Sequence, residues 1–301
     1  VLYMIDVAVI ASIPYLRRLS AAGTIDMALT HLVLAQPTYA GFFQARARAG
    51  VSVVLDNSAY ELQDTTGAGM AAAPVLQAAA LTGAQLVVCQ DVLFDGPATL
   101  LTTQRFLDAA RHHHSAGAAG WRFIGVPQGR TRAEWLDCYH RLVATPGIDM
   151  IGLSKLSVPR CFGAPVAEAR IACVAHLLEL GAPMPFHLLG GDRSLPWELR
   201  EHRRRGHDRA EHGGVRSNDS SFAFWYAASG IDVDGHTGRA ERAATTKPDL
   251  VAAALTDTDL VTALRHVALL RDAAGLPACG PDAHNAPAGP GPLDQEGPPC
   301  H

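Results

Sequence analysis

The chain has 301 residues, of which 48% are hydrophobic and 18% are charged, so it is large and apolar enough for one sizeable core. It contains no uninterrupted apolar run of about 18 residues, which argues against a membrane-spanning helix. The net charge of −4 gives no overall attraction to a polyanion, so any contact with nucleic acid has to come from a local basic patch.

Apolar, β-branched runs alternate along the chain with Ala- and Leu-rich amphipathic stretches. We expect strands at 7–11, 27–34, 51–56, 86–91, 123–126, 150–153, 186–189 and 214–219. We expect helices at 38–49, 71–82, 98–114, 132–144, 166–180 and 195–205, and a final helix at 250–273. Glycines stand where a helix C-cap belongs, at Gly50, Gly83, Gly120, Gly147 and Gly181. This alternation favours a (β/α)8 TIM barrel over an open sheet.

The predicted barrel is a single domain over residues 1–275. Beyond Gly275 the chain becomes rich in proline and glycine, so we expect residues 276–301 to form a disordered tail. The first residues lack the basic region of a signal peptide, and none of the six cysteines forms a CxxC pair. These features predict a cytoplasmic protein with free, buried thiols.

Polar side chains end four of the expected strands, in the segments 55–61, 89–91, 126–129 and 217–221. In a parallel barrel the carboxyl ends of all strands meet at one mouth, where they present polar groups to a ligand. The sequence therefore predicts that Asp56, Asp91, Gln128 and Asp219 converge. Three carboxylates and a carboxamide suit recognition of a hydrogen-bonding heterocycle together with nucleophilic or acid–base chemistry, which favours an enzyme.

Over roughly residues 50–230, these segments together resemble the tRNA-guanine transglycosylase superfamily, and within it the shorter branch that inserts 7-deazaguanines into DNA, the DpdA-type proteins. The resemblance rests on the order and spacing of several strand ends. The matching segments are Asp56-Asn57-Ser58-Ala59-Tyr60-Glu61 (the family's Asp-Ser-Gly-Gly-aromatic-Gln), Asp91, Gln128-Gly129, Ile151-Gly152-Leu153, His187-Leu188-Leu189-Gly190-Gly191 and Asp219.

Two features depart from that pattern. Asn57-Ser58-Ala59 replaces the family's small Ser-Gly-Gly, which changes the shape of the expected pocket. The family's zinc motif, Cys-x-Cys-x2-Cys followed by a distant histidine, is absent, and Cys279 and Cys300 lie in the expected tail. We therefore expect no metal and no cofactor. The missing zinc motif also favours a DNA substrate over tRNA.

The resemblance implies a role for each strand-end residue. Asp219 is the expected nucleophile that forms a covalent glycosyl ester, and Asp56 is the expected general acid and base. From the residues alone, the alternative for Asp219 is a helix cap, and the alternative for Asp56 is the acceptor of an Asx turn. The expected substrate-binding residues are Asp91, which accepts two hydrogen bonds from a guanine edge, Gln128, which donates to its O6, and Gly129, Gly152, Leu153, Tyr60 and Leu189. Several of these residues also have a structural alternative. Asp91 would form a salt bridge in a loop, Gln128 would be a solvent-facing amide, and Tyr60 and Leu189 would be core residues.

The stretch from Arg193 to Arg216 contains seven arginines interleaved with four acids, and it lies between the last two expected strands. A basic patch at the barrel mouth would hold a phosphodiester backbone without reading bases. The expected backbone contacts are Arg193, Arg203, Arg204, Arg205 and Lys155. The alternative is a solvated helix with i,i+4 ion pairs. The run His112-His113-His114 is expected to be a solvated helix end, because three consecutive helical residues cannot face one metal ion.

The sequence thus predicts a pentosyltransferase that replaces guanine in a polynucleotide, DNA in preference to tRNA, with a 7-deazaguanine base. Its expected partners are nucleic acid, the free base and, where a modification system supplies them, accessory proteins. Two alternatives stay open. One is a tRNA-guanine transglycosylase with a degenerate zinc site, and the other is a catalytically silent barrel that binds nucleic acid or a partner.

Overall fold

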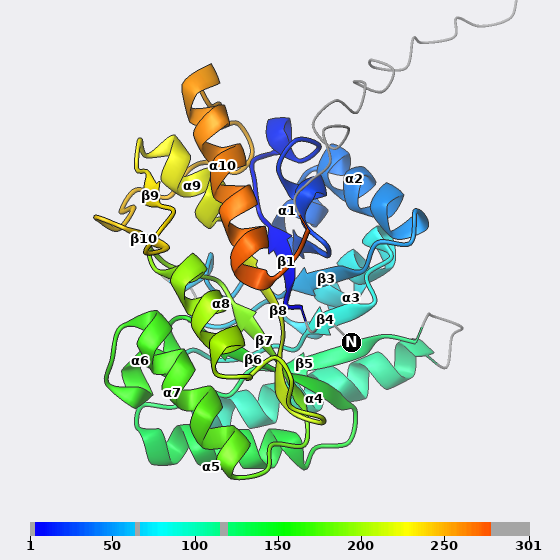
Figure 1. Cartoon of the computed structure of the whole chain (residues 1–301). Helices are drawn as coiled ribbons and strands as arrows, with labels where there is room; N and C mark the ends of the chain where they lie inside the picture. The colour runs from blue at the N-terminus through cyan, green and yellow to red at the C-terminus, as the bar shows by residue number, and fades with distance from the viewer. Residues whose placement is uncertain (1–3, 64–66, 115–119, 278–301) are drawn as a thin grey trace, which may run out of the picture.

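A computed structural model describes residues 4–63, 67–114 and 120–277 of the chain (Figure 1). Its main sheet consists of eight parallel strands in the order β1-β8-β7-β6-β5-β4-β3-β2. The strands are β1 (Asp6–Val9), β2 (Asp26–Leu29), β3 (Val53–Asp56), β4 (Leu86–Val88), β5 (Arg122–Gly125), β6 (Ile148–Ser154), β7 (Pro185–Leu189) and β8 (Gly214–Ser220). Thr24 joins the two ends of this order, because its hydroxyl accepts from the Val7 N–H and its own N–H donates to the Val7 carbonyl, both at 2.9 Å. The strands therefore form a nearly closed (β/α)8 barrel, as predicted.

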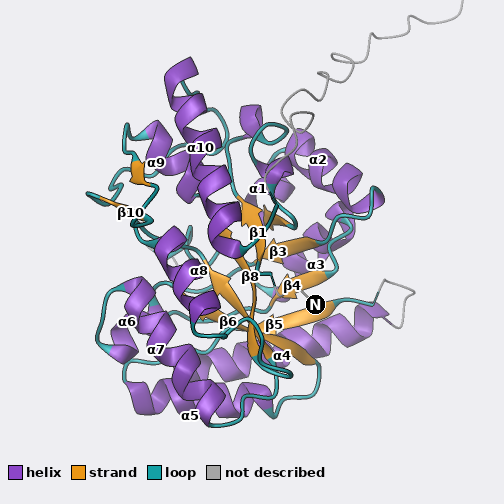
Figure 2. Ribbon diagram, viewed as in Figure 1, coloured by secondary structure: helices purple, strands orange, loops and turns teal. Residues whose placement is uncertain are grey.

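Helices cover the outside of the barrel and connect successive strands (Figure 2). They are α1 (Thr30–Ala35), α2 (Pro37–Arg48), α3 (Ala72–Thr82), α4 (Gly96–His114), α5 (Arg132–Val143), α6 (Ser157–Phe162), α7 (Val166–Glu179), α8 (Leu195–Arg204), α9 (Phe222–Ala228) and α10 (Asp257–Ala274). Short 3-10 turns η1 (Ile13–Tyr15) and η2 (Ser20–Ala22) follow β1, and a small hairpin of β9 (Val233–Asp234) and β10 (Arg239–Ala240) follows α9. The last helix, α10, packs against α8, α9 and β1 and so connects the end of the described chain to its start.

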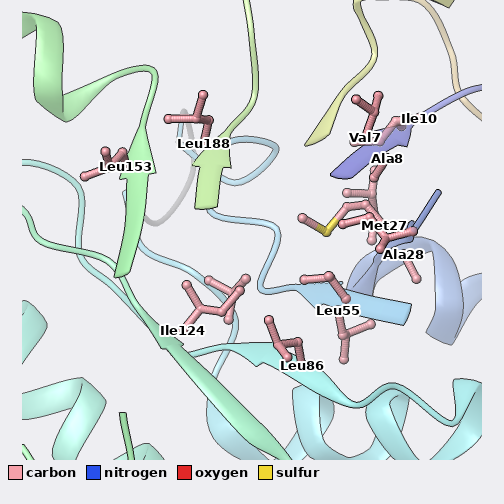
Figure 3. Close-up of a cluster of buried hydrophobic side chains, with 14 of the residues drawn as sticks. Val7, Ala8, Ile10, Met27, Ala28, Leu55, Leu86, Ile124, Leu153 and Leu188 are labelled. Carbon is pink, nitrogen blue, oxygen red and sulfur yellow. The ribbon is translucent and has the colours of Figure 1, made fainter. Parts of the chain in front are cut away.

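The core lies inside the barrel and between the barrel and its helices. Figure 3 shows apolar side chains from neighbouring strands, including Met27, Leu55, Ile124 and Leu188, gathered in the interior. All four are at most 2% exposed. Parallel strands are covered on both faces, which explains why their sequences read as continuous apolar runs rather than as alternating patterns.

The expected strands all occur, but the second is shorter than predicted. Residues 27–34 read as one apolar run, yet β2 ends at Leu29 and α1 begins at Thr30. β2 pairs with β3 only as far as Asp56, where the neighbouring strand ends. Beyond that point the chain has no partner in the ladder, and the Thr30 hydroxyl instead donates to the Asp56 carbonyl at 2.6 Å. The polypeptide therefore satisfies its backbone groups by turning into a helix.

Of the predicted C-cap glycines, Gly83 caps its helix, whereas Gly50 and Gly181 stand one residue after the C-caps of α2 and α7, Ala49 and Leu180. Gly83 ends α3 in the left-handed region, at φ +69°, as a C-cap glycine does. The final helix begins later than predicted, at Asp257, because Thr256 and Asp259 form a capping box there. The described cysteines, Cys89, Cys138, Cys161 and Cys173, are buried free thiols as expected. Residues 278–301 of the predicted tail, with Cys279 and Cys300, lie outside the described part of the chain. Within that part, the helices are all too short or too polar to span a bilayer.

Candidate active site

A pocket of about 760 Å³, including its opening to solvent, lies at the carboxyl ends of the barrel strands. Three predicted residues, Asp56, Asp91 and Asp219, line it together. They come from the ends of three different strands or the loops after them, β3, β4 and β8. Their convergence follows from the parallel barrel, in which every strand points toward the same mouth. Tyr60 and Leu189 also line the pocket, in agreement with their predicted positions beside a ligand.

Asp91 is held by two side-chain amides. Asn57 donates to its Oδ1 at 2.8 Å, and Gln128 donates to its Oδ2 at 2.6 Å. Burial raises the pKa of Asp91 to about 6, although these two hydrogen bonds act in the opposite direction. Asn57, the first of the three residues that replace Ser-Gly-Gly, therefore orients the Asp91 carboxyl.

Gln128 lies behind Asp91, and is not among the described residues that line the pocket. It is fully buried, and its Oε1 accepts from the Phe94 N–H at 3.0 Å while its Nε2 donates to Asp91. The predicted direct contact between Gln128 and a bound base is therefore not what the structure supports. The residue orients Asp91, because its amide already has a buried partner at each end.

Gly129, Gly152 and Leu153 likewise lie behind the described pocket wall. A Cβ at Gly129 would lie 2.6 Å from the Trp135 nitrogen, and one at Gly152 would lie 2.6 Å from Cδ1 of Leu189. Leu153 is fully buried. The structure therefore corrects their predicted role as direct ligand contacts. These residues allow close packing, and Gly152 leaves the space into which the pocket-lining Leu189 fits.

Asp56 closes the expected Asx turn and also lines the pocket. Its Oδ2 accepts from the Ser58 N–H at 2.7 Å, which is the expected Asx turn, and its side chain also faces the pocket. Ser58 has a φ of +61°, in the left-handed region where the family carries a glycine. Its hydroxyl contacts Nδ1 of His31 at 2.9 Å, which helps to hold this conformation. Burial, and then the negative charges of Glu61 and Asp219, hold the pKa of Asp56 well above its usual range.

Glu61 is a fourth pocket acid, to which the sequence analysis assigned no role. It lines the pocket, and its Oε2 is buried without a hydrogen-bond partner in the described chain. Burial raises the pKa of Glu61, while Lys247 and Lys155 lower it. Asp56 and Glu61 thus retain a proton at a pH where isolated carboxyls would have lost it. The sequence did contain a signal for Glu61, because it lies five residues after Asp56 in a segment that follows a strand end.

Asp219 is fixed through one oxygen only. Its Oδ1 accepts from the Gly190 N–H at 3.1 Å and lies 3.0 Å from Nε2 of His187. The other His187 nitrogen, Nδ1, lies 2.7 Å from the Ser217 hydroxyl. Among the described residues, no hydrogen bond reaches Oδ2, which is therefore available for chemistry in the pocket. The helix-cap alternative is not supported, because α9 starts at Phe222 without a side-chain cap and Ser220 accepts from the Phe222 N–H.

A buried ion pair supports the strand end beside Asp219. Arg170 donates to both carboxylate oxygens of Glu198, at 2.7 and 2.6 Å, and both side chains are fully buried. The same guanidinium donates to the carbonyls of Leu189 and Gly190, at 3.2 and 2.9 Å. Because Gly190 also donates to Asp219, this pair helps to place the carboxylate.

Lys155 faces the pocket instead of lying on the surface. Its Nζ is 3.8 Å from the centroid of the Tyr60 ring, and Nζ of Lys247 is 3.6 Å from the same centroid. Burial lowers the pKa of Lys155, and the charges of Asp219 and Glu61 act against this. Two cations thus contact one aromatic ring at the edge of an acidic pocket.

The predicted basic patch at the barrel mouth is wrong for Arg203, Arg204 and Arg205. They lie at the end of α8, which runs back from β7 to the start of β8 and so ends at the opposite face of the barrel from the pocket. Arg204 and Arg205 pair with Glu201, as the solvated-helix alternative predicted, and Arg203 packs against the end of α10. Of the expected backbone contacts, Arg193, in the loop after β7, and Lys155 lie at the pocket end.

Neither the protein-family models nor the curated proteins compared with this chain give a match. Among the described residues, no group of three or more histidines, cysteines or acids is arranged to hold a metal ion. The described part of the chain is thus a (β/α)8 barrel with a buried, acid-lined pocket at the carboxyl ends of its strands.

The raised pKa of Asp91 predicts how stability depends on pH. The native carboxyl keeps its proton up to about pH 6, whereas the unfolded chain releases it near 3.8. The native state therefore binds more protons between these values, so the free energy of unfolding should fall as pH rises. Relative to Asp91→Asn, the wild type should lose roughly 2.4 kcal/mol in total between pH 4 and pH 7. Urea unfolding of both proteins at one-unit intervals measures this difference.

The exposed Asp108→Asn protein, changed on α4, is the control and should follow the wild type across this range. A constant difference between wild type and Asp91→Asn at every pH would mean that Asp91 is already ionised in the native state at pH 4.

Proposed function

We propose that this protein is a base-exchange glycosyltransferase that replaces guanine in a polynucleotide, DNA in preference to tRNA, with a 7-deazaguanine base. The observation that carries the proposal is the meeting of Asp56, Asp91 and Asp219 in one pocket, with Oδ2 of Asp219 available. The resemblance of the strand-end segments to the transglycosylase superfamily supplies the reaction, and its DNA-modifying branch supplies the preferred substrate. The buried acids and the geometry of the pocket are consistent with this reaction and with this substrate.

In the first step, Oδ2 of Asp219 attacks C1′ of the target nucleotide and the bond from C1′ to N9 of guanine breaks. The electron pair of that bond leaves with the base, which takes a proton from Asp56. Asp56 suits a proton donor because its raised pKa keeps the proton at a pH where an isolated carboxyl would have lost it. His187 and the Gly190 N–H hold Oδ1 of Asp219 and so orient the attacking oxygen.

In the second step, N9 of the incoming base attacks C1′ and the ester bond to Asp219 breaks. The proton on that N9 passes to Asp56, which restores the starting state of both carboxyl groups. One base has left with a proton and another has entered without one, so the exchange needs no further reactant. Glu61 lies beside Asp56 and raises its pKa, which favours the return of the proton.

Asp91 is placed to recognise the edge that both bases share. Guanine and 7-deazaguanine each carry an N1–H and an exocyclic amine, and a carboxylate has lone pairs for both in addition to those used by Asn57 and Gln128. Tyr60 and Leu189 provide the apolar surfaces of the same pocket. Since the differences between the two bases lie at the other edge of the ring, one site can accept the leaving and the incoming base in turn.

Incorporation of radiolabelled guanine tests the proposal. Purified protein is incubated with labelled guanine and either guanine-containing DNA or tRNA, and nucleosides from cells supplied with a 7-deazaguanine are analysed in parallel by mass spectrometry. We expect label and modified nucleoside in DNA. Label in tRNA alone would favour the transglycosylase with a degenerate zinc site. Label in neither polymer would reject base exchange and favour a silent binding barrel.

A further inference from the structure

We propose that a groove beside the pocket, formed by residues 242–254 and the end of α9, binds the backbone phosphates of the substrate strand. The inference rests on the proposed function for the identity of the strand, but it is carried by a separate set of residues. Its cationic members are Lys247 and Arg242, with Arg193 next to them.

Four cations near the pocket have no salt-bridge partner among the described residues. In the described chain, Lys155, Arg193, Arg242 and Lys247 form no salt bridge, whereas acids neutralise most of the arginines on and around α8. The paired arginines are Arg200 with Asp272, Arg204 and Arg205 with Glu201, Arg209 with Asp208, and Arg239 with Glu168. These side chains are not held in ion pairs, so an anionic ligand at the mouth could contact them directly.

A second cavity, of about 790 Å³ including its opening, lies among these cations. Arg242, Lys247 and the hydroxyl-bearing residues Thr245, Thr246 and Ser229 line it, and its described lining contains no acid. Guanidinium, ammonium and hydroxyl groups are the donors that proteins use for phosphate oxygens. The two acids of the same segment, Glu241 and Asp249, lie outside this lining, and Asp249 accepts from the Val251 N–H.

The second cavity adjoins the proposed catalytic pocket. Lys247 lines the cavity, and its Nζ also contacts the ring and the carbonyl of Tyr60, which lines the pocket. Leu250, three residues later, lines the pocket itself. The Trp225 indole donates to the Thr246 carbonyl at 2.6 Å, which anchors the segment to α9. One lysine thus stands between the two cavities.

Arg193 is attached to the other end of the same segment. Its Nη1 donates to the Glu241 carbonyl at 3.4 Å, and its own carbonyl accepts from the Ala240 N–H at 2.8 Å. A nucleotide whose base enters a buried pocket leaves its phosphates outside the mouth. Lys247 and Arg242 on the segment, with Arg193 hydrogen-bonded to Glu241 at its start, therefore offer contacts to the phosphates that flank the target nucleotide.

Binding of a fluorescein-labelled, single-stranded oligodeoxynucleotide, followed by anisotropy at several salt concentrations, tests this inference. Each lost phosphate contact should reduce the slope of log K against log salt by about 0.7. We expect this reduction for Lys247→Ala and for Arg242→Ala, and about twice this reduction for the double variant. Lys247→Arg should restore most of the slope. The matched control is Arg204→Ala, at the opposite face, which should bind as the wild type does.

Inorganic phosphate added at constant ionic strength distinguishes a strand-binding groove from a site for the free ion. We expect no displacement of the oligonucleotide beyond that caused by sulfate. Displacement that disappears in the double variant would mean that the cavity holds free phosphate, and would overturn the proposal.

The remaining outcomes separate this inference from the proposed function. Wild-type slopes in folded Lys247→Ala and Arg242→Ala proteins, or no oligonucleotide binding by the wild type, would overturn the groove. Reduced slopes without any incorporation of guanine would leave the groove standing and reject the base exchange. Thermal melting of each variant confirms that a change in binding does not come from unfolding.

Discussion

Replacing Asp219 with asparagine is expected to reduce incorporation of labelled guanine into DNA by a factor of 10² or more, while binding of the oligonucleotide stays near that of the wild type. The physical reason is that an amide oxygen is a poor nucleophile and cannot form a stable glycosyl ester. The two hydrogen-bond contacts at position 219 can persist in the variant, because its amide oxygen can accept from the Gly190 N–H and from His187. The loss should therefore lie in the chemical step.

The matched control for this variant is Asp108→Asn, which changes an exposed carboxyl on α4 in the same way. It should incorporate label at the wild-type rate. Trapping supplies a second readout: the wild type, stopped by denaturation during turnover, should carry DNA covalently, and Asp219→Asn should not. Incorporation by Asp219→Asn at the wild-type rate would remove the covalent intermediate from the mechanism.

The second large effect is expected at Asp56. In Asp56→Asn the side chain still closes the turn to the Ser58 N–H but cannot transfer a proton to the departing base. Single-turnover release of guanine should fall by a factor of 10² or more. Because the wild-type donor must be protonated and its pKa is raised, release should decline as pH increases through that raised pKa. The variant should lose this decline together with most of its rate.

Glu61 allows a sharper test of the same argument. Its charge raises the pKa of Asp56, so Glu61→Gln should move the decline in guanine release to lower pH while the proton donor itself remains. Glu241→Gln, an exposed acid on the segment after β10, is the control and should leave the profile in place. A profile that does not move in Glu61→Gln would show that the two carboxyls are not coupled during the reaction.

Much of the architecture could be predicted from the chain alone. The apolar runs and the amphipathic stretches between them specify strands and helices locally, and a parallel barrel is the arrangement that buries such strands on both faces. Once the barrel is accepted, its topology sends every strand end to one mouth. This is why Asp56, Asp91 and Asp219 could be predicted to meet although they lie far apart in the sequence.

The tertiary structure decided which of the predicted residues face the pocket. Gln128 and Asp91 are 37 positions apart, and only their contact shows that the amide orients the carboxyl instead of lining the cavity. Arg193 precedes the first turn of α8 and lies at the pocket mouth. Because the helix runs away from the mouth, Arg203–Arg205 at its end lie at the opposite face of the barrel.

The same holds for the charges around the pocket. Lys155 is buried against Tyr60, and Lys247, 187 positions from Tyr60, reaches the same ring. The pKa of Asp56 is raised by burial and by the charges of Glu61 and Asp219, and the pKa of Glu61 is raised by burial and by the charge of Asp219. Neither burial nor these charges can be read from the local sequence. The amino-acid pattern by itself determined the barrel and the group of acids at its mouth, because local apolar periodicity and strand direction are enough for both. The protonation of the pocket acids, the orientation of Asp91 and the positions of Lys155 and Lys247 depend on contacts between distant residues, which only the folded chain brings together.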